Sequence, residues 1–75
     1  MREIKFYRTY SYSEDNAKME IRDFETEELA REDALNDNSN VNFSLFEQTM
    51  KFDGNITVVG KFITMIPYGK QIKRR

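Results

Sequence analysis

The side chains in this sequence that could do chemistry are carboxylates, hydroxyls and amines, because the 75 residues include no cysteine and no histidine. This composition removes the thiolate nucleophile, the commonest general base and the usual zinc ligands. There is also no Gly-rich phosphate loop and no G-x-S-x-G nucleophile elbow. A pair of carboxylates across a cleft could still catalyse hydrolysis, but a domain this small has little room for a cleft of roughly 300 Å³ or more. We therefore expect no enzyme, no catalytic residues and no cofactor.

An oxygen-rich stretch near the middle of the chain is the nearest approach to a metal site. Asp33, Asp37 and Asn38 could offer oxygen ligands, but the Asp-x-Asp-x-Asp-Gly spacing of an EF-hand and its later Glu are absent. Asn residues after a helix commonly cap its last carbonyl groups. Residues 36–40 are therefore interpreted as a polar loop that ends a helix, and no metal site is expected.

Charge is the strongest functional signal, because a formal net charge of −1 conceals two opposite segments. Residues 14–37 carry ten acidic and three basic side chains, whereas residues 61–75 carry five basic side chains and no acidic one. Such asymmetry is typical of proteins that bind a charged partner, or of chains in which the two segments neutralise each other. Carboxylates spaced along one surface can imitate the phosphates of DNA. Our hypothesis is that an acidic surface engages, and could inhibit, a basic protein such as a DNA-binding one; its residues are Glu14, Asp15, Glu27, Glu28, Glu32 and Asp33.

Two other interpretations of the charged segments stay open. The acidic side chains could form an ordinary solvated surface, since Asp and Glu favour solubility. The basic segment could instead bind nucleic acid by neutralising phosphates. The residues that would do so lie in a C-terminal tail, residues 70–75, and are Lys70, Lys73, Arg74 and Arg75.

The elements that must position these charges are predicted from the alternation of apolar and polar residues. Residues 3–12 and 17–24 each alternate, and the polar residues 13–16 between them predict a hairpin loop. Thr26 is a typical helix N-cap, followed by acidic residues that favour the first turn. A helix of about 11 residues is too short to persist alone, so it must pack on the sheet. The inward side chains of the second strand are predicted to be Ala17, Met19 and Ile21, with Lys18, Glu20 and Arg22 outward.

A second hairpin is predicted after the helix. Residues 41–52 and 55–66 flank Asp53-Gly54, a strong turn signal. The apolar residues of 41–52 change parity midway, which indicates a β-bulge or two apolar faces. Gly60 indicates either a bulge in the last strand or a point where another group lies close to its backbone.

Together the predicted elements form an α+β fold, a small antiparallel four-stranded sheet in the order β-β-α-β-β with one helix packed on one face. We expect one domain over residues 1–69, followed by the tail. A chain of this length buries only about 60% of its unfolded surface, and its last strands carry apolar residues of both parities. We therefore expect a homodimer, because self-association supplies the missing burial. The dimer face is predicted to hold Val59, Ile63 and Met65.

One segment also supports a resemblance to known proteins. Phe24-Glu25-Thr26-Glu27-Glu28 follows a Lys- and Tyr-rich hairpin and precedes an Ala-bearing helix and a closing hairpin, and this arrangement resembles many small ββαββ proteins of bacteriophages and prophages. The resemblance implies a phage or prophage setting. For that setting our hypotheses are that the chain acts on a host protein or, alternatively, that it is a structural subunit of the particle. The resemblance implies no particular activity, and no functional residue follows from it. No signal-peptide pattern and no apolar run of roughly 18 residues occurs, so we expect a cytoplasmic protein, in the host if phage-encoded, with no membrane contact.

Overall fold

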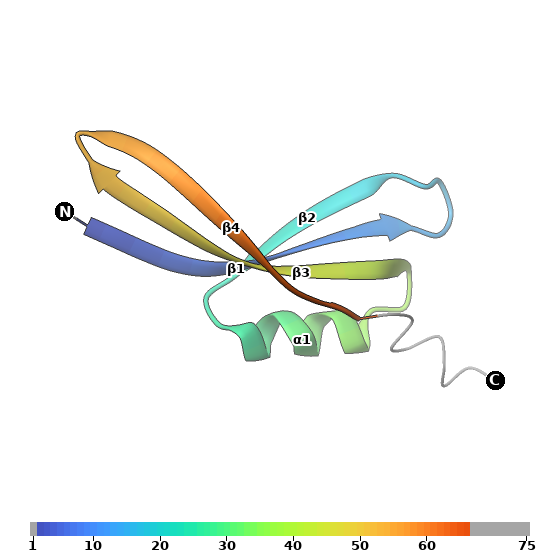
Figure 1. The fold of residues 1–75 in the computed structure, drawn as a ribbon. Helices are drawn as coiled ribbons and strands as arrows, with labels where there is room; N and C mark the ends of the chain where they lie inside the picture. The colour runs from blue at the N-terminus through green and yellow to red at the C-terminus, as the bar shows by residue number, and fades with distance from the viewer. Residues whose placement is uncertain (1, 67–75) are drawn as a thin grey trace.

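The fold is a four-stranded antiparallel sheet with one helix on one of its faces (Figure 1), which confirms the predicted α+β class. The computed structural model describes residues 2–66. The strands lie side by side in the order β2-β1-β3-β4, so β1 and β3 are central and β2 and β4 are the edges. In chain order the elements are β1 (Arg2–Ser13), β2 (Met19–Phe24), α1 (Glu27–Asn36), β3 (Asn40–Asp53) and β4 (Asn55–Ile66).

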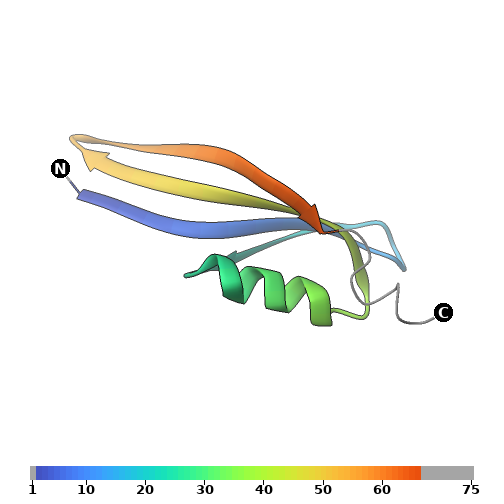
Figure 2. The ribbon, with the colours of Figure 1, turned by 60° about the horizontal axis from the view of Figure 1, so that its bottom comes forward.

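The sheet extends well beyond the helix. β2 pairs only with Tyr7–Tyr12 of β1, whereas β3 pairs with almost all of β1 and of β4. The first residues of β1 and the β3–β4 hairpin therefore project past α1 (Figure 2); we call this part, residues 2–6, 47–53 and 55–61, the projecting arm. The molecule measures 51 × 24 × 15 Å. Its radius of gyration is 14.0 Å, against about 11 Å for a compact chain of this length.

The helix begins and ends through local interactions that the sequence predicts. The Oγ1 of Thr26 accepts a hydrogen bond of 3.1 Å from the backbone N–H of Leu29, which confirms the N-cap. At the other end, the Nδ2 of Asn36 donates to the carbonyl oxygen of Glu32 at 2.9 Å. The backbone N–H of Asp37 donates to the carbonyl oxygen of Ala34.

The core is small and lies between α1 and the central strands. Two alanines of α1 face the sheet, and their short side chains let the helix approach it closely. The buried apolar residues are Ala30, Ala34, Phe43, Leu45 and Ile66, with Tyr7, Phe24 and Ile63 partly buried against them.

The predicted orientation of the first hairpin is wrong. The register pairs Thr9 with Arg22, and Thr9 is fully buried on the side that α1 covers. Met19 and Ile21, which we expected inward, instead lie on the other side of the sheet and are 54% and 49% exposed. Ala17 is an exposed residue with a φ of 59° just before β2. Alternation separates the two faces of a strand, but it does not say which one a helix will cover.

The parity change between Leu45 and Phe46 reflects two apolar faces of a strand that alternates regularly there, because the extra residues of the sheet lie elsewhere. The side chains of Phe43 and Leu45 lie on the side of the sheet that α1 covers, whereas the side chain of Phe46 lies on the opposite face. A register shift between Leu45 and Phe46 leaves Ile63 of β4 as an extra residue, and a second shift accompanies Asn42, whose φ is 58°. The sheet therefore has apolar residues on both faces.

Candidate functional site

One side of the sheet is not covered by α1, and we call this side the open face. It is the face that carries Tyr10, Phe46 and Phe62, and no element of residues 2–66 lies over it (Figures 1 and 2). Monomeric proteins rarely leave large apolar patches exposed. Eight of its large apolar residues are between 44% and 67% exposed: Ile4, Tyr12, Met19, Ile21, Ile56, Val58, Phe62 and Met65.

A row of aromatic rings crosses the middle of the open face. The ring centroids of Tyr10 and Phe46 lie 5.4 Å apart, and those of Phe46 and Phe62 also lie 5.4 Å apart, both in edge-to-face geometry. Each ring comes from a different strand, so the row ties β1, β3 and β4 together. It also places three contacting rings at the centre of the open face.

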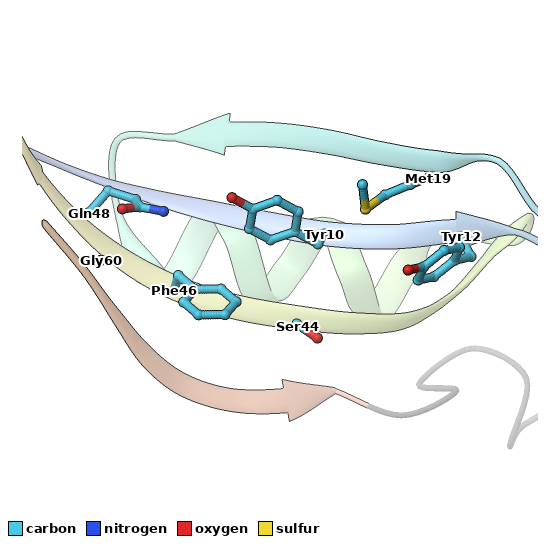
Figure 3. Close-up of a pocket in the computed structure, with 7 residues that line it drawn as sticks. All are labelled: Tyr10, Tyr12, Met19, Ser44, Phe46, Gln48 and Gly60. Atoms are coloured by element: carbon cyan, nitrogen blue, oxygen red, sulfur yellow. The ribbon is translucent and has the colours of Figure 1, made fainter. Parts of the chain in front are cut away.

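Beside this row runs a shallow groove of about 560 Å³. Figure 3 shows its side chains on the side of the sheet away from the helix. The Gln48 side chain lies over Gly60, where an added Cβ would approach its Oε1 to 2.8 Å, so the predicted close approach at Gly60 is confirmed. The groove is lined by Tyr10, Tyr12, Met19, Ser44, Phe46, Gln48 and Gly60.

The open face is nearly free of net charge. Its charged members within residues 2–66 are Arg2, Arg8 and Asp23. Arg8 donates two hydrogen bonds to Asp23, of 2.7 and 3.1 Å, so the two charges neutralise each other. The hydrogen bond to Asp23 raises the pKa of Arg8 above its ordinary value. The guanidinium groups of Arg8 and Arg2 also lie over the rings of Phe6 and Phe52, at 5.5 and 5.8 Å.

The other side of the projecting arm is charged, whereas its open face is apolar. The register places Glu3 beside Lys51 there, with 3.9 Å between the ammonium and the carboxylate, and it places Glu47 beside Lys61. Lys5 also belongs to this side. No helix covers either side of the arm (Figure 2). The charged side therefore suits water, and the apolar side suits a partner.

On the helix side, Arg22 organises the contact between α1 and β2. Its guanidinium lies 2.9 Å from Glu20, 2.6 Å from Asp33 and 2.9 Å from Asp37, measured between nitrogen and oxygen atoms. It also lies 5.9 Å from the ring centroid of Phe43. Three carboxylates from β2, α1 and the following loop thus converge on one cation, which attaches the helix to the polar side of the first hairpin.

Asp37 also fixes the loop between α1 and β3. Its Oδ1 accepts hydrogen bonds from the backbone N–H groups of Ser39 and Asn40, at 2.7 and 2.6 Å. Burial opposes the ionisation of Asp37, but these bonds and the one from Arg22 outweigh burial and lower the pKa of its carboxyl. The hydrogen bond from Arg22, together with one from Asn40, also lowers the pKa of Glu20.

The six residues of the predicted acidic surface do not share one environment. Asp33 binds Arg22, and Glu27 binds Arg31 at 2.8 Å. Glu28 and Glu32 are exposed, one turn apart on α1. The remaining two, Glu14 and Asp15, lie in the turn between β1 and β2, and a 3.0 Å backbone hydrogen bond from Glu14 to Ser39 ties this turn to the loop after α1.

The three residues of the predicted dimer face are not on one face. Val59 lies opposite Thr49 on the charged side of the projecting arm, Ile63 packs against the core, and Met65 lies on the open face. The extra residue at the β4 bulge causes this separation, because it reverses the parity between Val59 and Met65. The proposed nucleic-acid-binding residues, Lys70, Lys73, Arg74 and Arg75, lie outside the described residues.

Sequence reasoning gave less weight to the open face, although a signal for it was present. Ile4, Phe6, Tyr10 and Tyr12 share one parity of β1, and this is the parity of the open face. The missing information was the position of the helix. The contacts of Arg22 with Glu20, Asp33 and Asp37 fix that position, and they join separate elements of the folded chain, so the parity of β1 alone does not reveal it.

Within residues 2–66, no group of three or more acidic side chains is arranged to hold a metal ion, and Asp33 and Asp37 share the Arg22 guanidinium. In the same part of the chain, the one helix is too short and too polar to cross a membrane. Comparisons with protein-family models, with curated proteins and with solved structures found no match.

Proposed function

We propose that this chain is a non-enzymatic, cytoplasmic binding protein whose acidic helix surface engages a basic surface of another protein. The acidic helix surface is centred on Glu28 and Glu32; the other four residues of the predicted acidic surface lie on the same helix or in the turn between β1 and β2. The observation that carries the proposal is the exposure of these two carboxylates. Within residues 2–66, neither has an ion-pair partner, whereas Arg22 and Arg31 already bind other acids of the same segment.

This arrangement does not serve the stability of the helix. Like charges four residues apart on a helix destabilise it by about 0.2–0.5 kcal/mol. Glu28 and Glu32 stand in that relation, on the side of the molecule away from the open face. Negative side chains on successive turns can occupy a site that is shaped for phosphates. The charge pattern therefore favours a basic protein, such as a DNA-binding one, as the partner, and the phage or prophage setting that the resemblance implies would make it a protein of the host.

The test compares two pairs of substitutions that change the net charge equally. Glu28→Gln with Glu32→Gln neutralises the acidic helix surface, while Glu3→Gln with Asp53→Asn neutralises two exposed acids of the projecting arm. Proteins retained by the immobilised wild-type chain are identified by mass spectrometry over a series of salt concentrations. We expect a basic partner that the arm variant retains, that the helix variant loses, and that salt above about 0.1 M weakens by screening. A partner retained equally by both variants, or nucleic acid captured in its place, would refute this role for the helix.

A further inference from the structure

We propose that the open face is an interface with a second copy of this chain, so that two sheets stack face to face around a two-fold axis. This inference is independent of the acidic helix surface, which lies on the other side of the molecule. Its starting point is the division between the two faces of the projecting arm, one charged and one apolar, where α1 covers neither. Alternation of this kind is typical of a sheet that buries one face and solvates the other.

The area of the open face matches what a stable dimer needs. A large apolar side chain exposes on the order of 200 Å² when fully solvated, so eight residues that are about half exposed present on the order of 800 Å². The largest apolar patch on a typical monomer is only about 300–600 Å². A standard protein interface buries about 800 Å² on each partner. The open face is thus of interface size.

The small core indicates that a second copy must cover the open face while the chain folds. Only five apolar residues within residues 2–66 are buried, and two of them are alanines. A chain of this length is marginally stable on its own, and neither disulfides nor thiolate metal sites can support it. A second copy is the one partner present whenever the chain is made, so it can supply the missing burial at the time of folding.

Charge and polar groups are also compatible with self-contact. Arg8 and Asp23 neutralise each other within the chain, which leaves only Arg2, at the start of β1, as a net charge on the open face within residues 2–66, so two identical open faces do not repel each other strongly. The groove offers the hydroxyls of Tyr10 and Tyr12 beside the side chains of Ser44 and Gln48, which gives polar atoms potential partners across the interface. Stacked sheets lie about 10 Å apart, with side chains interdigitated between them. The two helices then form the outer layers.

The first test is the mass of the wild-type chain by sedimentation equilibrium at tens of micromolar. We expect twice the chain mass of 9.0 kDa. We also expect the melting temperature to rise with protein concentration, because association stabilises the folded state. A monomer whose melting temperature does not depend on concentration would overturn the proposal. A mass above two copies would do the same, since an isologous interface closes at two.

The second test assigns the face, with a matched pair of neighbouring residues. Val58 on the open face and Val59 on the charged side of the arm are 50% and 57% exposed, and both are replaced by Lys. Val58→Lys should halve the mass measured by sedimentation equilibrium, or should give an unfolded chain by circular dichroism, because folding and association are coupled. Val59→Lys should remain a folded dimer. The reverse pattern, or a folded dimer in both variants, would refute the open face as the interface, and Phe62→Lys at the aromatic row provides an independent repeat.

Discussion

Replacing Arg22 by Met removes the cation that joins three elements while keeping an unbranched apolar stem in its place. The side chain of Asp37 is only 9% exposed, and that of Arg22 is 23% exposed. Exposed ion pairs contribute about 0–1 kcal/mol, whereas breaking a buried pair costs about 3–5 kcal/mol because a charge is left buried and unpaired. The Arg22 site lies between these limits. We expect the free energy of unfolding to fall by about 2–3 kcal/mol, which for a domain of this size lowers the melting temperature by about 8–24 °C.

Arg31→Met is the matched control. Its ion pair with Glu27 has the spacing i, i+4, and the two side chains are 43% and 40% exposed. Such a pair contributes about 0.3–0.5 kcal/mol. Urea unfolding followed by circular dichroism, at one protein concentration for all variants, measures both changes.

A double-mutant cycle then tests the cause assigned to the loss. If the cost of Arg22→Met comes from a buried, unpaired Asp37, adding Asp37→Asn should remove a large part of it, because the amide oxygen still accepts hydrogen bonds and carries no charge. A loss below about 0.5 kcal/mol for Arg22→Met would show that the site behaves as an exposed pair. Strictly additive losses in the cycle would show that Asp37 is not the group left unpaired.

Three further predictions concern single residues. The pKa values of Asp37 and Glu20 are lowered on folding. The stability that these carboxylates contribute is therefore complete at a pH above their pKa values in the unfolded chain, and it is lost as the pH falls through their pKa values in the folded chain. Acid unfolding followed by circular dichroism should show a weaker dependence of stability on pH in Asp37→Asn than in the wild-type chain. Thr26→Ala should lower the free energy of unfolding by about 1 kcal/mol through loss of the N-cap, measured by urea unfolding. Thr9→Val should raise it by about 1 kcal/mol, because the buried Oγ1 of Thr9 has no hydrogen-bond partner within residues 2–66; an unchanged midpoint would indicate that this hydroxyl is satisfied.

The elements that sequence reasoning predicted well are set by local interactions. Thr26 caps the helix through a residue three positions later, and Gly54 turns the chain with a φ of 78° between two strands that pair directly. In both cases the residue type and its immediate neighbours decide the conformation. The strand boundaries, the helix and the sheet class follow from the same local signals.

The features that sequence reasoning missed depend on residues far apart in the chain. The covered face of the first hairpin is the one whose Arg22 meets Asp33 and Asp37, and those contacts exist only after the helix has folded back. Likewise, the parity of Met65 depends on the extra residue Ile63, which only the pairing with β3 reveals. A grouping of β4 residues by parity alone could not find the open face.

The two proposed surfaces have a joint consequence. α1 and the open face lie on opposite sides of a molecule that is 15 Å across its thinnest dimension. Stacking two open faces would therefore place the two acidic helix surfaces outward, on opposite sides of the dimer. One dimer could then bind two basic partners, or two subunits of one partner whose sites are far enough apart. Because a second contact on the same partner is intramolecular, a dimeric or repetitive basic target would be held more tightly than a monomeric one. Dimerisation would then raise the apparent affinity for such a target without any new kind of contact to it.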